Sequence, residues 1–437
     1  MVGCFYFWPM EIPDLYKIYL DTPRATTDTR KDVRNTVFFC LKGPNFDANS
    51  FALTALERGA THVVADDAQL ADHANITVVD DVLITLQKLA RHHRNQFKFP
   101  VIGLTGSNGK TTNKELIAAV LSRKYRTYFT HGNLNNHIGV PLTLLSIPLD
   151  AEMAVVEMGA NAQGEIRDLS TISDPDYGMI TNIGKAHLEG FGGIEGVKKG
   201  KSELYKHIRA KNAKLFVNGD DAVLMEISEG IDRTLYGSQE EFYCSGSLLK
   251  RKPFISFGFE HDGHSSGEIQ TQLVGAYNFS NLMAAACMGC YFDVPMRDIS
   301  SALSDYKPSN NRSEMVDTGK NKLILDAYNA NPSSMELAMA NFAEMDHEPK
   351  LALVGHMLEL GKDSAVEHQK LIDQLSDLGL KAILVGRNFS ECNKKGFHYC
   401  ETPEDLKFWL QSNPLENHLI IAKGSRLVAM EKSKEFL

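Results

Sequence analysis

Residues 101–121, VIGLTGSNGKTTNKELIAAVL, constrain the fold of this chain more than any other stretch. An apolar run typical of a buried strand leads into a glycine-rich loop, and a helix-forming run begins near Thr111. This order offers backbone N–H groups and the positive end of a helix dipole to phosphate oxygens. Lys110 can neutralise terminal phosphates, and a threonine hydroxyl can ligate Mg²⁺. The stretch therefore predicts a nucleoside triphosphate site on an α/β sheet, built from Gly106, Ser107, Asn108, Gly109, Lys110, Thr111 and Thr112.

The spacing of this loop is unusual, because Leu104 stands where the common GxxxxGK[ST] pattern has its first glycine. The alternative interpretation is a strand–turn–helix junction whose glycines only permit the turn. The strand–loop–helix context that the phosphate-binding motif requires is present, and it favours the nucleotide site.

Length and composition limit the class of protein. A chain of 437 residues is too long for one core and indicates two to four domains. The net charge of −9 argues against nucleic-acid binding, although Lys198, Lys199 and Lys201 form a local basic patch. Cys287 and Cys290, the one close cysteine pair, are predicted to be buried free thiols, as in a reducing cytosol.

The N-terminal residues lack the basic start of a signal peptide, and no apolar run approaches the ~20 residues of a membrane span. We therefore expect a cytoplasmic protein with no membrane insertion.

Alternating strand and helix patterns divide the chain into three α/β blocks, residues 1–85, 86–305 and 306–437. The central block is expected to carry a mostly parallel, helix-covered sheet, and the last block to be a second, Rossmann-like α/β unit that follows the segment 307–311. Helices are expected over residues 51–58, 81–97 and 282–288. The predicted strands are residues 37–41, 61–65, 101–104, 153–157, 178–181, 215–218, 323–325, 351–354, 382–385 and 419–422.

Several polar groups follow predicted strands of the central block. Glu157 and the segment 182–189, with His187, fall at strand ends, where a carboxylate and an imidazole could bind a divalent cation beside a triphosphate. Lys201, from sequence physics alone, is expected on a solvated basic face. Asn278 and Asn281 precede an apolar helix and could read a base edge or cap the helix.

The last block has two polar clusters of the same kind. Residues 326–332, DAYNANP, could form a turn or contact nucleotide and substrate. Residues 423–426, KGSR, combine two cations with a hydroxyl and suit an anionic substrate group.

Taken in order, these motifs resemble the Mur ligases, the ATP-dependent amide ligases of peptidoglycan precursor synthesis. The segments TGSNGKTT (105–112), EMG (157–159) and NIGKAHLE (182–189) carry the resemblance, which spans essentially the whole chain. Further segments resemble the members that join D-alanyl-D-alanine to a UDP-N-acetylmuramoyl-tripeptide (UDP-MurNAc-tripeptide). They are NLNNHIGVPLTLL (133–145), YNANP (328–332), MLELG (357–361), KGSR (423–426), and Asp28-Thr29-Arg30 with residues 38–47.

The resemblance implies roles for particular residues. ATP contacts would come from the loop and from Asn278, Asn281, Arg312 and Asp326. Mg²⁺ would be held by Thr111, Glu157, His187 and a carbamylated Lys201, and Lys110, His187 and Lys201 would be catalytic. Substrate contacts would be Thr29, Arg30, Lys42, Phe46, Asp47, Asn133, Asn135, Asn136, Tyr328, Asn329, Asn331, Lys423, Ser425 and Arg426.

The resemblance also implies a reaction: γ-phosphoryl transfer to a peptide carboxylate, then attack by an amine. Residues 1–85 would bind the UDP-sugar peptide, and the protein is expected to be a monomer. The chain departs from the family pattern at His137, at His356 and at residues 325–328, LDAY.

Alternatives are another Mur-type or a folate-polyglutamate-type ATP-dependent amide ligase, a regulatory P-loop ATPase and a non-enzymatic scaffold. The sequence leaves open whether the third residue of the tripeptide is meso-diaminopimelate or lysine.

Overall fold

The computed structural model describes residues 10–308 and 311–437. The expectation about a signal peptide rests partly on residues 1–9, and the predicted boundary segment includes Ser309 and Asn310; these residues lie outside the described ranges. The chain forms two compact units. Unit 1 comprises Met1–Gly103, Tyr125–Gly159 and Glu165–Tyr177, and unit 2 comprises Leu104–Lys124, Ala160–Gly164 and Gly178–Leu437.

Unit 1 contains a four-stranded parallel sheet in the order β1-β2-β5-β6. Strands β2 and β5 are buried along their length, as apolar runs in helix-covered parallel sheets are. The elements are α1 (Ile12–Asp21), β1 (Ala25–Thr26), β2 (Val37–Phe39), β3 (Lys42–Gly43), β4 (Phe46–Asp47), α2 (Ala52–Glu57), β5 (His62–Ala65), β6 (Ile76–Val78), α3 (Val82–Arg94), β8 (Thr127–Phe129), α5 (Gly139–Leu145), β9 (Met153–Glu157) and α6 (Glu165–Ser173).

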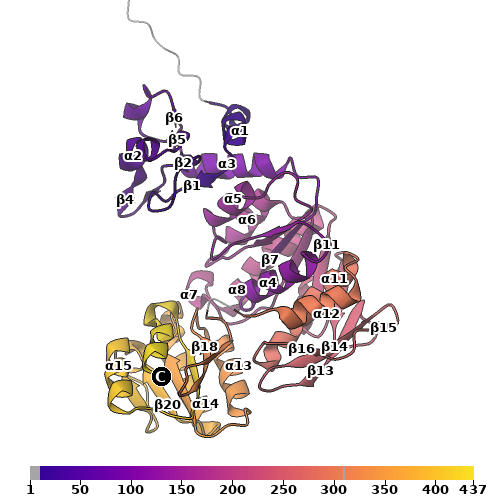
Figure 1. The fold of residues 1–437 in the computed structure, drawn as a ribbon, viewed down its shortest axis with the longest axis vertical. Coiled ribbons are helices and arrows are strands. Elements are labelled where there is room, and N and C mark those ends of the chain that lie inside the picture. The colour runs from indigo at the N-terminus through magenta and orange to yellow at the C-terminus, as the bar shows by residue number, and fades with distance from the viewer. Residues whose placement is uncertain (1–9, 309–310) are drawn as a thin grey trace, which may run out of the picture. The chain divides into compact units, whose positions relative to one another are not determined.

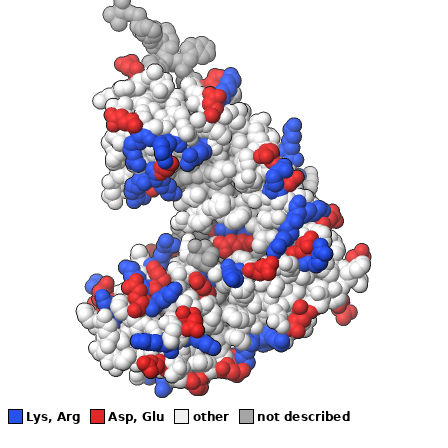
Figure 2. All heavy atoms as spheres, in the orientation of Figure 1, with Lys and Arg blue, Asp and Glu red and all other residues white. Residues whose placement is uncertain are grey.

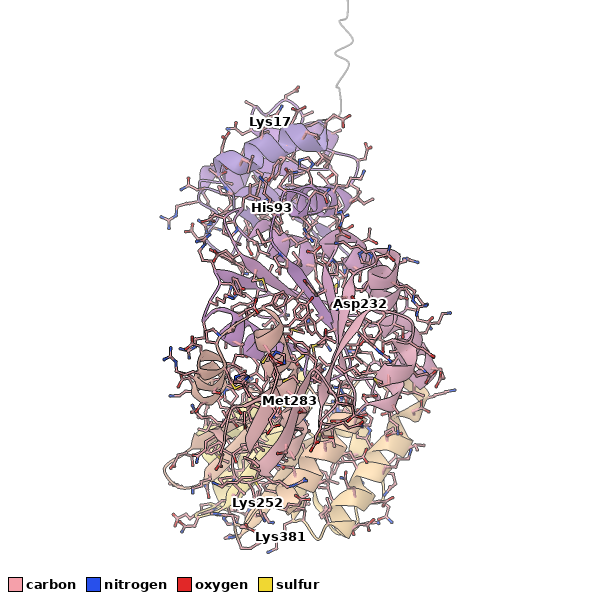
Figure 3. The ribbon with its side chains drawn as sticks, turned by 90° about the vertical axis from the view of Figure 1, so that its right-hand side faces the viewer. Lys17, His93, Asp232, Lys252, Met283 and Lys381 are labelled. Atoms are coloured by element: carbon pink, nitrogen blue, oxygen red, sulfur yellow. The ribbon has the colours of Figure 1, made fainter. Side chains whose placement is uncertain are left out.

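Helix α3 packs against α1, α5 and α6 within unit 1. Asp81 caps its first turn by accepting a hydrogen bond from the N–H of Ile84 at 2.8 Å. Near its other end, the buried His93 (labelled in Figure 3) contacts the Tyr16 hydroxyl of α1 at 2.9 Å and the Ile147 carbonyl at 2.8 Å. Both ring nitrogens are satisfied by the protein, so His93 has a structural role.

The largest sheet has the strand order β15-β14-β13-β12-β11-β10-β7-β9-β8, with β16 paired to β14. Its strand β7 (Val101–Thr105) ends at the glycine-rich loop, and α4 (Lys110–Leu121) follows. The other elements before residue 306 are β10 (Tyr177–Ile180), α7 (Leu188–Phe191), α8 (Ile194–Lys201), α9 (Glu203–Ala210), β11 (Lys214–Asn218), α10 (Ala222–Ile227), β12 (Arg233–Gly237), β13 (Cys244–Lys250), β14 (Ser256–His261), β15 (His264–Ser265), β16 (Ile269–Gln270), α11 (Phe279–Tyr291) and α12 (Met296–Asp305).

Helix α11 packs closely on β13 in the interior of unit 2. Met283, labelled in Figure 3, is fully buried. A Cβ built on Gly246 of β13 would stand 2.6 Å from its sulfur atom, so this position requires glycine. The described cysteines, including Cys287 and Cys290 of α11, are free, and both of these are buried, as predicted.

The rest of unit 2 carries a six-stranded sheet in the order β17-β18-β22-β19-β20-β21, with only β17 antiparallel. Helices α13, α14 and α15 cover it in the orange and yellow part of Figure 1. Capping boxes at Asn331 and Thr402 begin α13 and α15. The elements are β17 (Glu314–Asp317), β18 (Lys322–Asp326), α13 (Pro332–Ala343), β19 (Lys350–Gly355), α14 (Ser364–Asp377), β20 (Ala382–Val385), β21 (His398–Cys400), α15 (Pro403–Ser412) and β22 (Leu419–Lys423).

The α/β fold class is confirmed, and the predicted strands and helices are present within a few residues of their expected ends. The three larger sheets each fall inside one of the predicted blocks. Strands β12 to β16 were not predicted, because β13 is largely exposed and lacks a continuous apolar run. Among the described residues, none of the helices has the length and apolar content needed to cross a bilayer.

Candidate active site

The glycine-rich loop between β7 and α4 is fastened to the segment that follows β10. The Ser107 N–H donates to the Asn182 carbonyl at 3.0 Å, and the Asn108 N–H donates to the Asn182 side-chain oxygen at 3.0 Å. The Thr181 hydroxyl donates to the Asn108 carbonyl at 2.6 Å. Three hydrogen bonds therefore tie the loop to this segment.

This anchoring corrects one expectation from the sequence. The N–H groups of Ser107 and Asn108 were expected to face phosphate, but they are used within the protein. The N–H groups of Lys110, Thr111 and Thr112 lie in the first turn of α4, which offers no helical acceptors for them. The helix start is thus the candidate phosphate-binding part of the motif.

Lys110 and the two threonines occupy that helix start. The Lys110 ammonium donates to the carbonyl oxygens of Gly106 at 2.8 Å and Ser107 at 3.1 Å. It therefore lies over the loop, where a terminal phosphate would sit. Thr111 is buried and Thr112 is partly buried.

Gly109 makes the tight turn into α4 with φ +75. Its left-handed conformation suits glycine, and a Cβ there would meet the Asn281 side-chain oxygen at 3.0 Å. Gly106, with φ +145, has still less room, since a Cβ would stand 1.9 Å from the Thr181 hydroxyl. The two glycines are required by close packing as well as by the turn.

Asn278 and Asn281 belong to a buried chain of amides beneath this turn. Asn281 donates to Asn278 at 2.8 Å and accepts from Asn113 at 2.6 Å, and Asn113 also donates to the Gly109 carbonyl at 2.9 Å. Asn278 stands at the N-cap of α11, but its side chain makes no capping hydrogen bond to the helix backbone. The sequence left open whether Asn278 reads a base edge or caps the helix, and the structure shows no capping by its side chain.

The loop also contacts the helix α13 of the C-terminal sheet. The Asn331 amide donates to the Asn108 side-chain oxygen at 2.7 Å. Next to it, the N–H of Lys185 donates to the Ser333 hydroxyl at 3.0 Å, and the Lys185 ammonium pairs with Glu367 of α14 at 3.0 Å. These contacts join residues more than 140 positions apart at the phosphate loop.

His187 lies immediately before α7 and itself adopts the left-handed backbone conformation. It has φ +54 and makes a close ion-pair contact from Nδ1 to Glu359. The contact does not have hydrogen-bond geometry, and Nδ1 is buried without a hydrogen-bond partner. The histidine lowers the pKa of Glu359.

Lys201 ends α8 and is 1% exposed, so the expectation of a solvated face is wrong. Its ammonium donates to the Ala160 carbonyl at 3.1 Å and lies 5.0 Å from the ring centre of Phe191. The basic patch is accordingly reduced to Lys198, which pairs with Glu226 at 2.8 Å, and the exposed Lys199. Lys201 lies four positions after the buried Val197, so the two residues share one face of α8.

In unit 1, Glu157 ends β9 and is also 1% exposed. Asn135 donates to one carboxylate oxygen at 2.7 Å, and the other oxygen is buried without a hydrogen bond. Asn135, predicted to bind substrate, thus holds the carboxylate. Asn136 accepts from the Gly139 N–H at 2.8 Å at the start of α5, while Asn133 is exposed.

The ends of two neighbouring strands of the C-terminal sheet bring Asp326 and Lys423 together. The residues are register partners, and their side chains pair at 2.5 Å. Lys423 is almost fully buried, and its charge is neutralised by Asp326. The Ser313 N–H donates to the other carboxylate oxygen at 3.2 Å.

Tyr328 follows the same strand and lies beside two guanidinium groups. The Arg312 guanidinium is 3.7 Å from the ring centre and that of Arg426 is 5.0 Å away. Arg312 has a buried Nε without a hydrogen-bond partner. Arg312, expected from the sequence to contact ATP, and Arg426, expected to contact substrate, therefore lie in one cluster around Tyr328.

Other predicted positions around this cluster have local roles. The side-chain oxygen of Asn329 accepts from the N–H of Ala330 at 2.9 Å. The Ser425 N–H donates to the His356 carbonyl at 3.1 Å, while the Ser425 hydroxyl and His356 Nδ1 are buried without partners. Burial lowers the pKa of His356, which keeps the ring neutral near pH 7.

The predicted substrate residues of the N-terminal sheet lie on a polar surface of unit 1. Lys42 pairs with Asp66 at 2.9 Å and lies 3.8 Å from Asp47, and Phe46 is 59% exposed. The Thr29 carbonyl accepts from Arg58.

Basic side chains gather on this part of the molecule, over α2 and β4 in Figure 2. Arg30 forms a double hydrogen bond with Asp28 and lowers the pKa of that carboxyl to about 2. A surface cavity of about 390 Å³ is lined by Arg30, Lys31, Asp32, Val33, Arg34 and Arg58.

Asn113, Lys185, Glu359 and Glu367 were not assigned from the sequence. Asn113 follows the threonines directly, so its position on α4 was an available signal. The other contacts join distant segments, and no local pattern reveals them.

Comparison with known proteins identifies the family. Residues 104–289 match the Mur ligase middle domain, and residues 311–426 match the family described as Mur ligase, glutamate ligase domain. The chain is 34% identical to the UDP-N-acetylmuramoyl-tripeptide--D-alanyl-D-alanine ligase of Bacillus subtilis, over 93% of this chain and 91% of that protein. The enzyme of the same name from Escherichia coli is 33% identical, with 93% and 92% covered.

Solved structures agree with this assignment. MurF from Acinetobacter baumannii has a TM-score of 0.84 at 30% identity, covering 94% of this chain and 92% of that one. MurF from Thermotoga maritima in complex with ADP has a TM-score of 0.84 at 26% identity, with 95% and 97% covered. A folylpolyglutamate synthase from Mycobacterium tuberculosis, at 15% identity, shares the fold alone. The chain belongs to the Mur ligase family of ATP-dependent ligases.

Proposed function

We propose that this protein joins D-alanyl-D-alanine to a UDP-MurNAc-tripeptide and so forms the UDP-MurNAc-pentapeptide. The observation that carries the proposal is the 34% identity, over nearly the whole chain, to the Bacillus subtilis ligase of this name. The site described above supports it, because an ordered phosphate loop adjoins a second charged cluster that includes Lys423 and Arg426. Three domains with the boundaries 1–85, 86–305 and 306–437 belong to the same proposal.

The reaction proceeds in two steps. The terminal carboxylate of the tripeptide attacks the γ-phosphorus of ATP, ADP leaves, and an acyl phosphate forms. The free amine of D-alanyl-D-alanine then attacks the acyl carbon, inorganic phosphate leaves, and the amine loses a proton. Lys110 and the N–H groups at the start of α4 neutralise and orient the migrating phosphoryl group.

The residues present suit Mg²⁺. The unpaired, buried carboxylate oxygen of Glu157 is a hard oxygen ligand that needs a cation. Among the described residues, no three His, Cys, Asp or Glu side chains form a complete metal cluster. Thr111, His187 and Lys201 would complete the set with Glu157. When bound, Mg²⁺ would stabilise charge on the phosphates.

Lys201 gains its metal-binding capacity by carbamylation. Its neutral amine would attack CO₂, forming an N–C bond and releasing one proton, and the product carries a carboxylate-like group. The nearby ring of Phe191 limits the space around the nitrogen to a small group.

The UDP moiety would bind on the N-terminal sheet. The cavity lined by Arg30, Arg34 and Arg58 offers cations for a diphosphate, and the exposed Phe46 offers a ring on which a base can stack. Thr29, Lys42 and Asp47 surround the same face. D-alanyl-D-alanine would bind at the C-terminal cluster, where Ser425 and Arg426 can receive its carboxylate. Since ATP and UDP-linked sugars are cytoplasmic, we place the enzyme in the cytoplasm. The proposal also takes the enzyme to be a monomer.

The test is a phosphate-release assay with ATP, Mg²⁺ and each UDP-MurNAc-tripeptide, containing either meso-diaminopimelate or lysine, with and without D-alanyl-D-alanine. We expect release that requires both organic substrates, and mass spectrometry should detect the pentapeptide product. Release without the dipeptide would indicate an ATPase, and release with a folate and glutamate instead would indicate the other ligase class. No release with either tripeptide would refute the proposal.

A further inference from the structure

A buried chain of three side-chain amides runs beneath the phosphate loop, and Asn113 begins it. The Asn113 amide donates to the Gly109 carbonyl at 2.9 Å and to the Asn281 side-chain oxygen at 2.6 Å. Asn281 donates to Asn278 at 2.8 Å, and Asn278 donates to the Val274 carbonyl at 2.8 Å. Asn113 is fully buried, and Asn278 and Asn281 are 3% and 7% exposed. A group that lost its partner here would have no ready access to water.

Two backbone carbonyls fix the direction of this chain. A carbonyl oxygen can only accept, so the side-chain atom that faces the Gly109 carbonyl must be the nitrogen of Asn113. The same nitrogen faces Asn281, whose oxygen must therefore be the acceptor. At the far end, the Val274 carbonyl requires the nitrogen of Asn278 in the same way. The orientation of the Asn281 carboxamide is thus set by its neighbours, and Asn113 is one of them.

The chain lies directly against the turn into α4. A Cβ on Gly109 would stand 3.0 Å from the Asn281 oxygen and 3.4 Å from the Asn113 nitrogen. Asn113 is three positions after Lys110, near the start of the same helix. Its own side-chain oxygen is buried without a hydrogen-bond partner, a cost that the two donated bonds must offset. Asn113 therefore links the phosphate turn to the start of α11.

We propose that Asn113 is a positioning residue of the nucleotide site, which holds the Asn281 carboxamide in one orientation against the phosphate turn. The inference rests on the proposed nucleotide site and on the contact of Asn281 with ATP that the family resemblance implies. Asn113 is fully buried, so it acts through Asn281 and not on the nucleotide itself. A carboxamide that must be ordered during binding costs affinity, and Asn113 removes that cost.

The first experiment separates the two bonds that Asn113 donates. In Asn113→Ser, the hydroxyl can donate to the carbonyl four residues earlier, that of Gly109, but it is too short to reach Asn281. Calorimetry should show that this variant binds ADP about tenfold more weakly than the wild type, the effect of one lost hydrogen bond. Asn113→Leu removes both bonds at similar volume, and its loss should be at least as large.

Asn321 provides a matched control, because it is also a buried carboxamide that donates two hydrogen bonds. It lies just before β18, is 3% exposed, and donates to the carbonyls of Leu415 at 2.8 Å and Leu437 at 2.7 Å. Asn321→Ser should lower the urea midpoint of unfolding, as Asn113→Ser does, but its affinity for ADP should equal that of the wild type. The comparison distinguishes a loss of positioning from a general loss of stability.

Steady-state phosphate release provides a second readout. Asn113→Ser should raise the KM for ATP about tenfold and change kcat little, because Asn113 orients a binding group and contacts no reacting atom. Asn321→Ser should change neither constant.

Unchanged ADP affinity in folded Asn113→Ser protein, or an equal loss in Asn321→Ser, would overturn the inference. A lowered kcat with an unchanged KM in Asn113→Ser would do the same. If one of the two Asn113 variants does not fold, the ADP affinity of the other decides. The ADP measurement requires no ligase substrate, so this failure is distinguishable from a wild type that binds ADP but releases no phosphate.

Discussion

The side-chain amide of Asn331 donates a hydrogen bond to the side-chain oxygen of Asn108 at 2.7 Å, which joins the first turn of α13 to the phosphate loop. Asn331 has a second role, because its oxygen caps α13 by accepting from the Ser334 N–H at 3.0 Å. One residue therefore begins a helix of the C-terminal sheet and secures that helix to the nucleotide site.

The two roles of Asn331 can be separated by substitution. Asn331→Ser keeps a capping oxygen but is too short to reach Asn108. The free energy of unfolding should therefore stay near the wild-type value, while kcat/KM for ATP should fall about tenfold, the effect of losing one hydrogen bond at the site. Asn331→Ala should show the same kinetic loss and also lose about 1 kcal/mol of stability. Equal kinetics in wild type and Asn331→Ser would show that the contact does not matter for turnover.

Lys110 is expected to be essential for turnover. Lys110→Ala removes the cation over the loop and should lower kcat about 10²- to 10³-fold, measured by phosphate release. Lys124→Ala is the matched control, because Lys124 follows the other end of the same helix and bonds the Asp293 carbonyl there. Near-normal turnover in Lys110→Ala would remove the lysine from the phosphate site.

Gly109 offers a test of close packing at the loop. Gly109→Ala should weaken ADP binding, measured by calorimetry, because its Cβ would crowd Asn281 and the backbone would be strained at φ +75. Gly132→Ala is a suitable control, since φ is +57 but no atom lies within 4 Å of the added Cβ. Both variants should lose about 1–2 kcal/mol of stability from strain, and only Gly109→Ala should lose nucleotide affinity. Equal ADP affinities would contradict the packing argument.

The Lys185–Glu367 ion pair predicts a pH dependence of stability. Burial raises the pKa of Glu367, but hydrogen bonds from Lys370 and Lys185 outweigh it and hold the pKa below its usual value. A lowered folded-state pKa stabilises the protein above the unfolded value of about 4.3, and this stabilisation is lost as the pH falls through the folded-state pKa.

In urea titrations, Glu367→Gln should therefore be less stable than wild type at pH 7, and the difference should shrink as the medium becomes acidic. Glu391→Gln, which removes an exposed carboxyl outside this ion pair, is the matched control. A difference for Glu367→Gln that is constant with pH would contradict the ion-pair account.

Carbamylation of Lys201 predicts a dependence on CO₂. Activity should fall in CO₂-depleted buffer and return when bicarbonate is added, with the mass of one CO₂ gained at Lys201. Lys201→Ala should be inactive and unresponsive, whereas Lys199→Ala, two positions away but exposed, should behave as wild type. Full activity of Lys201→Ala would exclude the carbamate.

The sequence by itself determined the local chemistry of this protein. The run 101–121 specified a strand, a glycine-rich turn and a helix because apolar continuity, positive-φ glycines and helix-forming residues follow one another within a single segment. The same logic located the strands that end at Glu157, Asp326 and Lys423. Local sequence suffices where the physical cause of a structure lies within a few residues.

Tertiary structure decided which side chains meet and which are removed from water. The sequence could not show that Lys201 is buried, that Ser107 and Asn108 use their N–H groups on Asn182, or that Glu359 contacts His187. These outcomes depend on packing between segments separated by up to about 170 residues, and hydrogen-bond partners at that range leave no periodic trace in the sequence.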